Sequence, residues 1–332
     1  MNNAFAPTNT RPQRLKPARW GTALGLGLAL GLGLGVGVPG WAQASNPAVG
    51  CPPPPMPLEQ QMAYIAQAPA RDAGFLWRIE KSGRTSWLYG TMHLNHIDFA
   101  KPGPQVMAGV RSSDVLAVEI NPNERQDLDG VVLPGGIRVS ATQLQRLRRA
   151  YAQDCLATDP ATVHPVGAAT PLLGTQAQRQ GLFFGYSPDA RLIQIAQRMG
   201  KPVVPLETLA QQITALAPTS QAEFDHMLET TLTGVESGSL QAELVGLNRA
   251  WQQNDWPAMV RLERDTAAQQ PGFAQRLNGE RNVLMAHKID TLHQGGQRVF
   301  VAVGVLHMAG PAALPQLLQD KGYRVTPVTL RP

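Results

Sequence analysis

Two short motifs in this sequence place a histidine three residues after a glycine, and each follows residues typical of a β-strand. The motifs are Gly90-x-x-His93 and Gly304-x-x-His307. Two imidazoles can bind a divalent metal ion that activates water, and an imidazole beside a carboxylate can instead act as a general base. Glycine lets the backbone turn sharply off a strand. Either motif alone is a weak signal, because an isolated histidine is more often a hydrogen-bonded residue of the core or of a loop.

Two glutamates lie near the ends of other apolar runs of the sequence. Glu119 lies within the run 115–120, and Glu207 comes directly after 203–206. A buried carboxylate is costly unless it is paired or binds a metal, and the alternative for Glu119 is an exposed strand end. Ligands of open α/β sheets bind beyond the carboxyl ends of the strands. If these strands are parallel neighbours, both histidines and both glutamates lie at one edge of the sheet.

Other chemical motifs add little. His96 follows His93 by three residues and either joins the same site or lies in an exposed loop. The remaining histidines fall in expected loops or on helix faces, where an ordinary polar role is expected. The sequence has no Gly-x-Ser-x-Gly, no phosphate-binding loop and no His-Glu-x-x-His, so serine hydrolase, NTPase and zincin functions lack support.

The elements that must position these residues follow from hydrophobic periodicity. Alternation over 75–80 and 85–90 around a turn predicts a β-hairpin. Short apolar runs typical of a parallel sheet occupy 115–120, 203–206 and 299–305, and a last strand is expected at 323–328. Helices are expected at 58–67, 141–152, 188–199, 221–232, 240–253, 257–268, 276–293 and 311–320.

Strands separated by helices at both ends of the chain predict an α/β fold. We expect a mixed, largely parallel sheet flanked by helices, with the β-hairpin near the start and a helical cap inserted at about 210–295. The expected organisation is a signal peptide over 1–44, a Pro/Ala-rich arm over 45–71, and one α/β domain over 72–332.

The first 44 residues have the pattern of a secretory signal peptide. Four basic residues and no acidic ones precede a Gly/Leu-rich apolar run, and Ala42-Gln43-Ala44 is a cleavage site before Ser45. The run is short for a membrane span and half of it is glycine, so cleavage is favoured over a retained anchor. We therefore expect export, to the periplasm in the first instance. A lipid anchor at Cys51 is less favoured, because Ala48 stands where such signals prefer Leu.

Removal of the signal peptide changes what the net charge of the chain indicates about its partners. The 332 residues carry 29 basic and 24 acidic side chains, a net charge of +5, with 43% hydrophobic residues and a mean hydropathy of −0.17. Four of the basic residues leave with the signal peptide, and the mature chain is close to neutral. No stripe of Lys and Arg with interleaved aromatics remains, so nucleic acid is not an expected partner. No transmembrane span is expected after cleavage.

The two cysteines, Cys51 and Cys155, exclude a Cys-built metal cluster. In an oxidising compartment an even pair favours a disulfide over two free thiols. That bond would tie the proline-rich arm to the end of the helix expected at 141–152. Neither cysteine lies in a local motif typical of a catalytic nucleophile.

An ordered set of segments resembles the TraB/PrgY/GumN family, in its exported GumN-like bacterial branch. The resemblance covers about 72–330 and rests on residues 75–93, 116–119, 201–208, 280–282 and 299–310. Animal members of this family, the Tiki proteins, are metal-dependent proteases built around two Gly-x-x-His motifs and an acid. More distant relatives resemble erythromycin esterases and haem-binding ChaN-like lipoproteins.

The resemblance implies roles for individual residues. His93 and His307 would be metal ligands or the catalytic base, and Glu119 the third ligand or the proton acceptor. Arg281 would hold a carboxylate, Glu207 would orient a histidine or the arginine, and Asn282 would belong to the same supporting set.

We therefore expect an exported hydrolase, a metal-dependent peptidase acting on a peptide or protein. The alternative is an envelope protein that binds haem or a metal ion without turnover. A structural or regulatory role in envelope assembly is a weaker third hypothesis. Water activation needs a carboxylate beside the imidazoles, whereas haem ligation does not, so Glu119 is the residue that separates the first two hypotheses.

Overall fold

The computed structural model describes residues 50–331 apart from 127 and 130, and the expected signal peptide lies outside the described residues. One six-stranded sheet has the order β4-β3-β5-β2-β1-β6. The strands are β1 (Phe75–Lys81), β2 (Arg84–Thr91), β3 (Val115–Val118), β4 (Val203–Pro205), β5 (Val299–Gly304) and β6 (Arg324–Val328).

The predicted mixed, largely parallel sheet is confirmed. The strand pairs β4–β3, β3–β5 and β5–β2 are parallel, and β1 is antiparallel to both of its neighbours, β2 and β6. Every strand except β1 therefore runs in the same direction. The hairpin of β1 and β2 turns through Ser82 and Gly83, both of which have positive φ. Because glycine adopts that conformation without cost, the turn can be tight.

Helices surround the sheet and alternate with its strands, as α/β periodicity predicts. Their bounds are α2 (Leu58–Gln67), α3 (Pro104–Ser112), α4 (Ala141–Gln153), α5 (Thr170–Gln178), α6 (Pro188–Arg198), α7 (Leu209–Leu216), α8 (Gln221–Ser237), α9 (Ser239–Gln252), α10 (Trp256–Gln269), α11 (Pro271–Ala274), α12 (Arg281–Gln294) and α13 (Leu314–Asp320).

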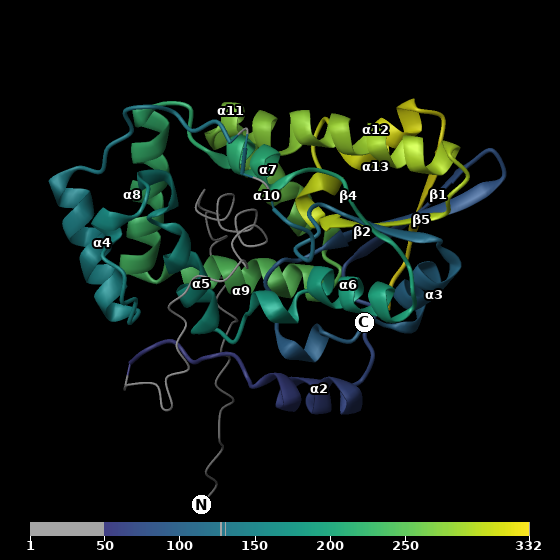
Figure 1. The fold of residues 1–332 in the computed structure, drawn as a ribbon, viewed down its shortest axis with the longest axis horizontal. Coiled ribbons are helices and arrows are strands. Elements are labelled where there is room, and N and C mark those ends of the chain that lie inside the picture. Colours follow the sequence, from purple (N-terminus) through teal and green to yellow (C-terminus); the bar gives the residue numbers. More distant parts are fainter. Residues whose placement is uncertain (1–49, 127, 130, 332) are drawn as a thin grey trace, which may run out of the picture.

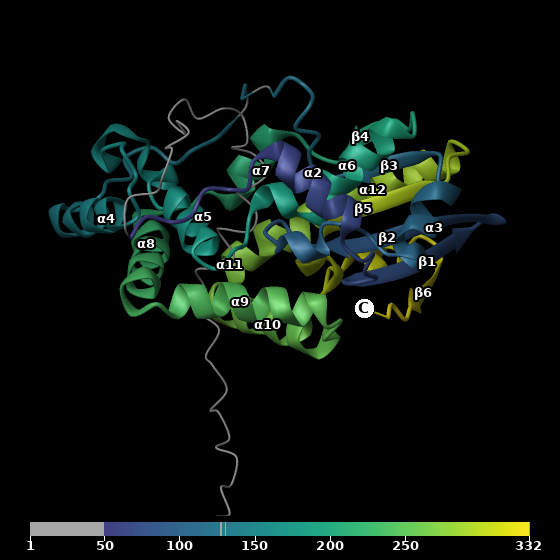
Figure 2. The same cartoon turned by 90° about the horizontal axis from the view of Figure 1, so that it is seen from below.

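Each face of the sheet has its own layer of helices (Figures 1 and 2). Alternate residues of the central strands point to opposite faces. Phe300 and Ala302 of β5 pack on one face with apolar residues of α3, α6, α9 and α10. Val301 and Val303 pack on the other face with residues of α12 and α13. The sheet is therefore buried on both sides, which explains why β3 and β5 are continuous apolar runs.

A helical lobe lies beside this sheet, at the left of Figure 1. It is formed by α4, α5 and α8, and its core includes Leu147, Tyr151, Leu172 and Phe224. The sequence predicted helical structure over 210–295, and α7 to α12 follow one another there. It did not predict that α4 and α5, from an earlier part of the chain, pack against α8.

One predicted helix has a different form. The sequence predicts a continuous helix over 276–293, whereas the structure has a π-helix, η5 (Gln275–Glu280), followed by α12. The side chains of an i→i+5 turn are rotated relative to those of an α-helix, and the amphipathic pattern does not reveal this.

The arm that precedes the sheet is held at both ends. The predicted disulfide between Cys51 and Cys155 is present, with Cα atoms 5.6 Å apart. Farther along the arm, Ile65 of α2 is buried in a small cluster with Ile97, Ala100 and Tyr186. The disulfide therefore fixes the start of the arm to the helical lobe, while α2 packs against Ile97, Ala100 and Tyr186.

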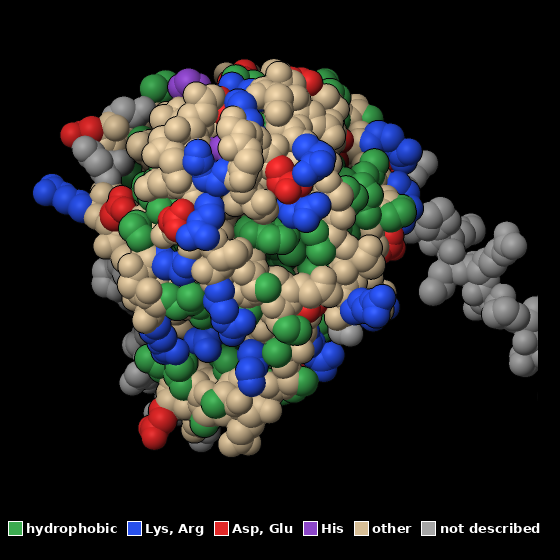
Figure 3. Space-filling model, turned by 90° about the vertical axis from the view of Figure 1, so that its right-hand side faces the viewer, with side chains coloured by type: hydrophobic (Ala, Val, Ile, Leu, Met, Phe, Trp, Pro, Cys, Tyr) green, Lys and Arg blue, Asp and Glu red, His purple; other side chains and the backbone are tan. Residues whose placement is uncertain are grey.

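Figure 3 views the molecule from the right-hand side of Figure 1. Lys and Arg side chains are dispersed on this face among Asp, Glu and hydrophobic side chains, and they form no continuous stripe there. Among the helices of residues 50–331, leaving aside 127 and 130, none combines the length and the apolar character that a membrane span requires.

Candidate functional site

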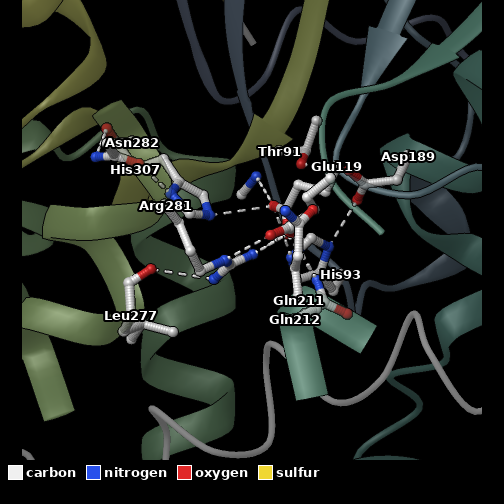
Figure 4. A network of polar contacts seen from close by, with 12 residues as sticks. Thr91, His93, Glu119, Asp189, Gln211, Gln212, Leu277, Arg281, Asn282 and His307 are labelled. Carbon is white, nitrogen blue, oxygen red and sulfur yellow. Dashed lines mark hydrogen bonds and ion pairs between the residues drawn. The ribbon is translucent and has the colours of Figure 1, made fainter. Parts of the chain in front are cut away.

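The residues proposed from the sequence meet at the carboxyl ends of the parallel strands. His93 follows β2, Glu119 follows β3, and Glu207 follows β4. His307 lies in a 3₁₀ turn, η6 (Val305–Met308), that begins directly after β5. Because β4, β3, β5 and β2 are successive neighbours in the sheet, these four side chains share one edge. Figure 4 shows His93, Glu119 and His307 close together there.

The His93 imidazole is held between two carboxylates. Its Nδ1 lies 3.1 Å from Oδ2 of Asp189, and its Nε2 lies 3.4 Å from Oε1 of Glu119. Thr91 Oγ1 donates a hydrogen bond to the other oxygen of Asp189. Burial alone would lower the pKa of His93, but Asp189 and Glu119 outweigh it and raise that pKa to about 10.

The His307 imidazole faces the same glutamate from the other side. Its Nε2 lies 3.5 Å from Oε1 of Glu119. Asn282 donates from Nδ2 to the carbonyl oxygens of His307 and Ala312, at 3.1 and 2.8 Å. The amide oxygen of Asn282 therefore faces Nδ1 of His307 and accepts its proton. In the neutral imidazole this tautomer leaves Nε2 unprotonated and free to bind a ligand or a proton.

Glu119 is the centre of the network and is only 2% exposed. Its Oε1 accepts a 2.6 Å hydrogen bond from the backbone N–H of Gly304, and its Oε2 accepts one from Arg281 Nη2 at 2.9 Å. Burial would raise the pKa of the Glu119 carboxyl, yet His307 and His93 lower it well below its usual range. Glu119 is therefore an ionised acceptor between two imidazoles.

Gly304, the first residue of the second motif, leaves the space that this arrangement needs. A Cβ at this position would lie 2.9 Å from Nε2 of His93 and 3.1 Å from Oε1 of Glu119. Any side chain would therefore push the imidazole and the carboxylate out of place. The sequence indicated a need for glycine here for its backbone freedom, and the structure adds this steric reason.

Arg281 joins the two glutamates. Its Nε donates to Glu207 Oε2 at 2.9 Å, while its Nη2 bonds to both Glu207 and Glu119. Gln212 of α7 donates from Nε2 to the same two glutamates, at 3.1 Å to Glu119 and 3.2 Å to Glu207. Burial would lower the pKa of Arg281, but the two carboxylates outweigh it and raise that pKa. The guanidinium therefore stays positively charged.

The charges at this edge do not balance without a further cation. Glu119, Glu207 and Asp189 are buried carboxylates, and Arg281 is the permanent cation among the residues that contact them. The three carboxylates and Arg281 carry a net charge of about −2, and the proton that the raised pKa keeps on His93 reduces this to about −1, which is still unfavourable in a poorly solvated site. Protonated imidazoles or a divalent cation would restore neutrality.

A small cavity opens beside these groups. Its volume is about 40 Å³, whereas one water needs roughly 10–15 Å³. His93, Glu119, Arg281 and His307 supply its polar wall. Its apolar wall is formed by Met92, Leu277, Val305 and Leu306. The site is therefore reachable by a small group and shielded by apolar side chains.

The donor set fits a divalent cation by its chemistry. In the part of the chain that the structure describes, no group of three or more His, Cys, Asp or Glu side chains is arranged so that it could hold a metal ion. The two imidazoles instead point their Nε2 atoms at Glu119 itself. Two histidines and a carboxylate are nonetheless typical metal ligands. Nδ1 of His93 faces Asp189 and Nδ1 of His307 faces Asn282, and a metal-binding histidine usually has such a partner on its other ring nitrogen.

Sequence reasoning missed several members of this site, and it left His96 open between the site and an exposed loop. Asp189 was recognised only as part of a helix start, and Thr91 and Gln212 were not singled out. An Asp in the first turn of a helix is a weak signal, since such residues usually face solvent. His96 pairs with Asp98 in a half-exposed loop, outside the cavity wall.

Fold and site together define a class: a mixed α/β protein with two histidines and a glutamate at the carboxyl edge of its parallel strands. The model of the TraB/PrgY/gumN family matches residues 75–327, and the chain belongs to that family.

Two relatives share most of this chain. "Uncharacterized protein YbaP" of Shigella flexneri is 28% identical over 241 residues, which cover 71% of this chain and 88% of that protein. The protein of the same name from Escherichia coli (strain K12) is 28% identical over 237 residues, covering 70% of this chain and 87% of its own. No solved structure matches the chain.

Proposed function

We propose that this protein is an exported hydrolase, a metal-dependent peptidase that uses His93, His307 and Glu119 to activate water. The observation that carries the proposal is the convergence of both imidazoles on one carboxylate oxygen, at 3.4 and 3.5 Å, beside a cavity. A hydrolase needs a group that takes a proton from water and a place for the attacked carbonyl next to it.

Each side chain has a role in this proposal. His93, His307 and Glu119 would hold the cation, which when bound polarises a carbonyl and lowers the pKa of water. Asp189 and Asn282 fix the ring orientations of the two histidines. Arg281 holds the second oxygen of Glu119, so that Oε1 stays directed at the imidazoles. The buried net charge of the carboxylates is the second support, because a divalent cation would neutralise it.

Export is a further part of the proposal. The disulfide between Cys51 and Cys155 supports it, because such bonds persist in oxidising compartments and are rare in reducing ones. The basic and apolar character of residues 1–44 supports it independently. We place the protein in the periplasm.

Haem binding without turnover is the alternative that the family resemblance raises. The room in the cavity, about 40 Å³, is narrow for a porphyrin, and Arg281 and Glu207 fill the adjacent space with ion pairs. These observations favour a small substrate group over a large planar ligand.

The test begins with protein purified without chelator, in which bound metals are measured by mass spectrometry. Cleavage of a random peptide library is then followed for the wild type, His93→Ala and His307→Ala, with His287→Ala as a control on an exposed histidine. We expect a divalent metal at about one per chain, and a loss of at least about a hundredfold in cleavage rate for the two site variants. Cleavage by both variants at the rate of the wild type would refute the proposal.

A further inference from the structure

The turn of π-helix that precedes α12 forms part of the cavity wall. Leu277 and Asn278 of η5 line the cavity together with Arg281. The carbonyl oxygen of Leu277 accepts a 3.1 Å hydrogen bond from Arg281 Nη1, so this turn also supports the guanidinium. Single π-helical turns within α-helical runs are rare and are often found at functional sites.

Asn278 differs from its neighbours in this wall. The residue is only 7% exposed. Several buried side-chain atoms in the described residues lack a hydrogen-bond partner, and among the residues that line the cavity the single such atom is Oδ1 of Asn278. His93, Glu119 and His307 all have partners within the protein.

An unpaired buried amide oxygen destabilises the folded protein, because it has given up its hydrogen bonds to water. No contact within the described chain compensates Oδ1 of Asn278. A ligand in the cavity that donates a hydrogen bond to Oδ1 of Asn278 would offset this loss of stability. An acceptor oxygen needs a donor, so the ligand must present an N–H or O–H group at this wall.

We propose that Asn278 is a substrate-binding residue whose amide oxygen accepts a hydrogen bond from a peptide N–H, so that the site takes peptides in preference to esters. The inference rests on the proposed peptidase function and adds the residue that would distinguish a peptide from an ester. A peptide group offers the N–H donor that Oδ1 lacks, whereas an ester has only acceptors. The apolar wall of Met92, Val305 and Leu306 suits the flanking apolar part of such a substrate.

The test combines two variants of Asn278 with a change in the substrate. Asn278→Ala removes the amide, and Asn278→Leu fills its volume without polar atoms. Glu280→Gln, at an exposed position of the same π-helix, is the control. The substrate is the library peptide that the wild type cleaves best, or the one it binds best if it cleaves none. Analogues of that peptide replace one N–H at a time by an ester oxygen.

For the peptide we expect both Asn278 variants to raise KM, or Kd where only binding is measured, by about tenfold, with kcat changed much less. For one ester analogue, the KM or Kd of the wild type should be higher than for the peptide by a similar factor. In the Asn278 variants the same analogue should have nearly the KM or Kd of the peptide, as a double-mutant cycle requires when both changes remove one hydrogen bond. The melting temperature of the variants should be equal to or above that of the wild type, because an unpaired polar group has been removed.

The outcomes separate the two proposals. If the wild type cleaves no peptide, the proposed function fails, and the inference is then decided by binding. Unchanged KM or Kd in Asn278→Ala and Asn278→Leu overturns the inference, and so does a lack of any peptide binding. A lowered melting temperature with unchanged KM would give Asn278 a structural role instead.

Discussion

β2 and α12 each contribute to two buried histidine networks, one at either end. At the end away from the cavity, His293 of α12 contacts Ser86 Oγ through Nδ1 at 2.9 Å and the carbonyl oxygen of Lys81 through Nε2 at 3.0 Å. Ser86 Oγ in turn accepts from the backbone N–H of Val299 at 2.8 Å. One tautomer satisfies all of these atoms, with Nε2 as donor and Nδ1 as acceptor.

At the other end of the same two elements, the network around His93 and His307 is open. Each imidazole has Nδ1 held by one partner, while both Nε2 atoms face a single oxygen of Glu119 beside a cavity. A serine–histidine contact at 2.9 Å would suggest a catalytic pair if distance alone were considered. Every polar atom of the His293 network is thus paired within the protein, whereas the network beside the cavity has two imidazole nitrogens directed at one oxygen, which is why we assign the first to stability and the second to the proposed function.

The change with the largest expected effect is Glu119→Gln. Its amide keeps the size of the side chain but cannot take a proton or bind a cation as a carboxylate does. We expect the rate of peptide hydrolysis to fall by about 10² to 10⁴. Glu59→Gln, in an exposed position of α2, is the control and should match the wild type. If Glu119→Gln retained full activity, the open network would have no role in the chemistry.

Arg281→Met is expected to destabilise the protein most. It leaves Glu119 and Glu207 buried without their shared cation, which should lower the free energy of unfolding by about 3–5 kcal/mol. Urea denaturation measures this loss, with Arg261→Met at an exposed position of α10 as the control. A stability like that of the wild type would mean that the two carboxylates do not depend on this guanidinium.

Removal of the disulfide disturbs neither network. Cys51 and Cys155 are separated by 104 positions in the sequence, so their link restricts a long loop of the unfolded chain. We expect the double change to serine to lower the free energy of unfolding by about 2–4 kcal/mol, while hydrolysis per folded molecule stays unchanged. A loss of activity in a variant that is fully folded would instead mean that the arm contributes to the site.

Ser86→Ala should have the smallest of these effects and is the direct test of the closed network. It leaves Nδ1 of His293 and the N–H of Val299 without their partner, at a cost of about 1–3 kcal/mol in unfolding free energy. Hydrolysis should be unaffected, and Ser237→Ala at the exposed end of α8 is the control. Loss of hydrolysis without loss of stability would make this network functional and would end the contrast between the two.

Much of the fold and part of the site could be predicted from the sequence, because both depend on local patterns. The alternation in β1 and β2 and the apolar runs of β3 and β5 specify strands buried on one or both faces. Once the strands are parallel neighbours, the residues that follow them must meet. His93, Glu119 and His307 were found in this way.

The remaining members come from helices, whose inward face depends on packing that the sequence does not display. Asp189 and Gln212 are polar residues of α6 and α7 and look like surface positions until those helices are docked. Asn278 was missed for another reason. Its direction depends on the π-helical turn, which shifts side chains away from the positions that a 3.6-residue period predicts.

The position of β5 has a consequence for the order of events during synthesis. It is the fifth strand along the chain, yet it lies between β3 and β2 in the sheet. The parallel pairs β2–β5 and β3–β5 cannot form until residues 299–304 have been made. Contacts between such distant segments close late and slowly in folding. A nascent chain that already contains His93 and Glu119 therefore has both side chains but not their arrangement, which forms only when residues 299–304 have been inserted between β3 and β2.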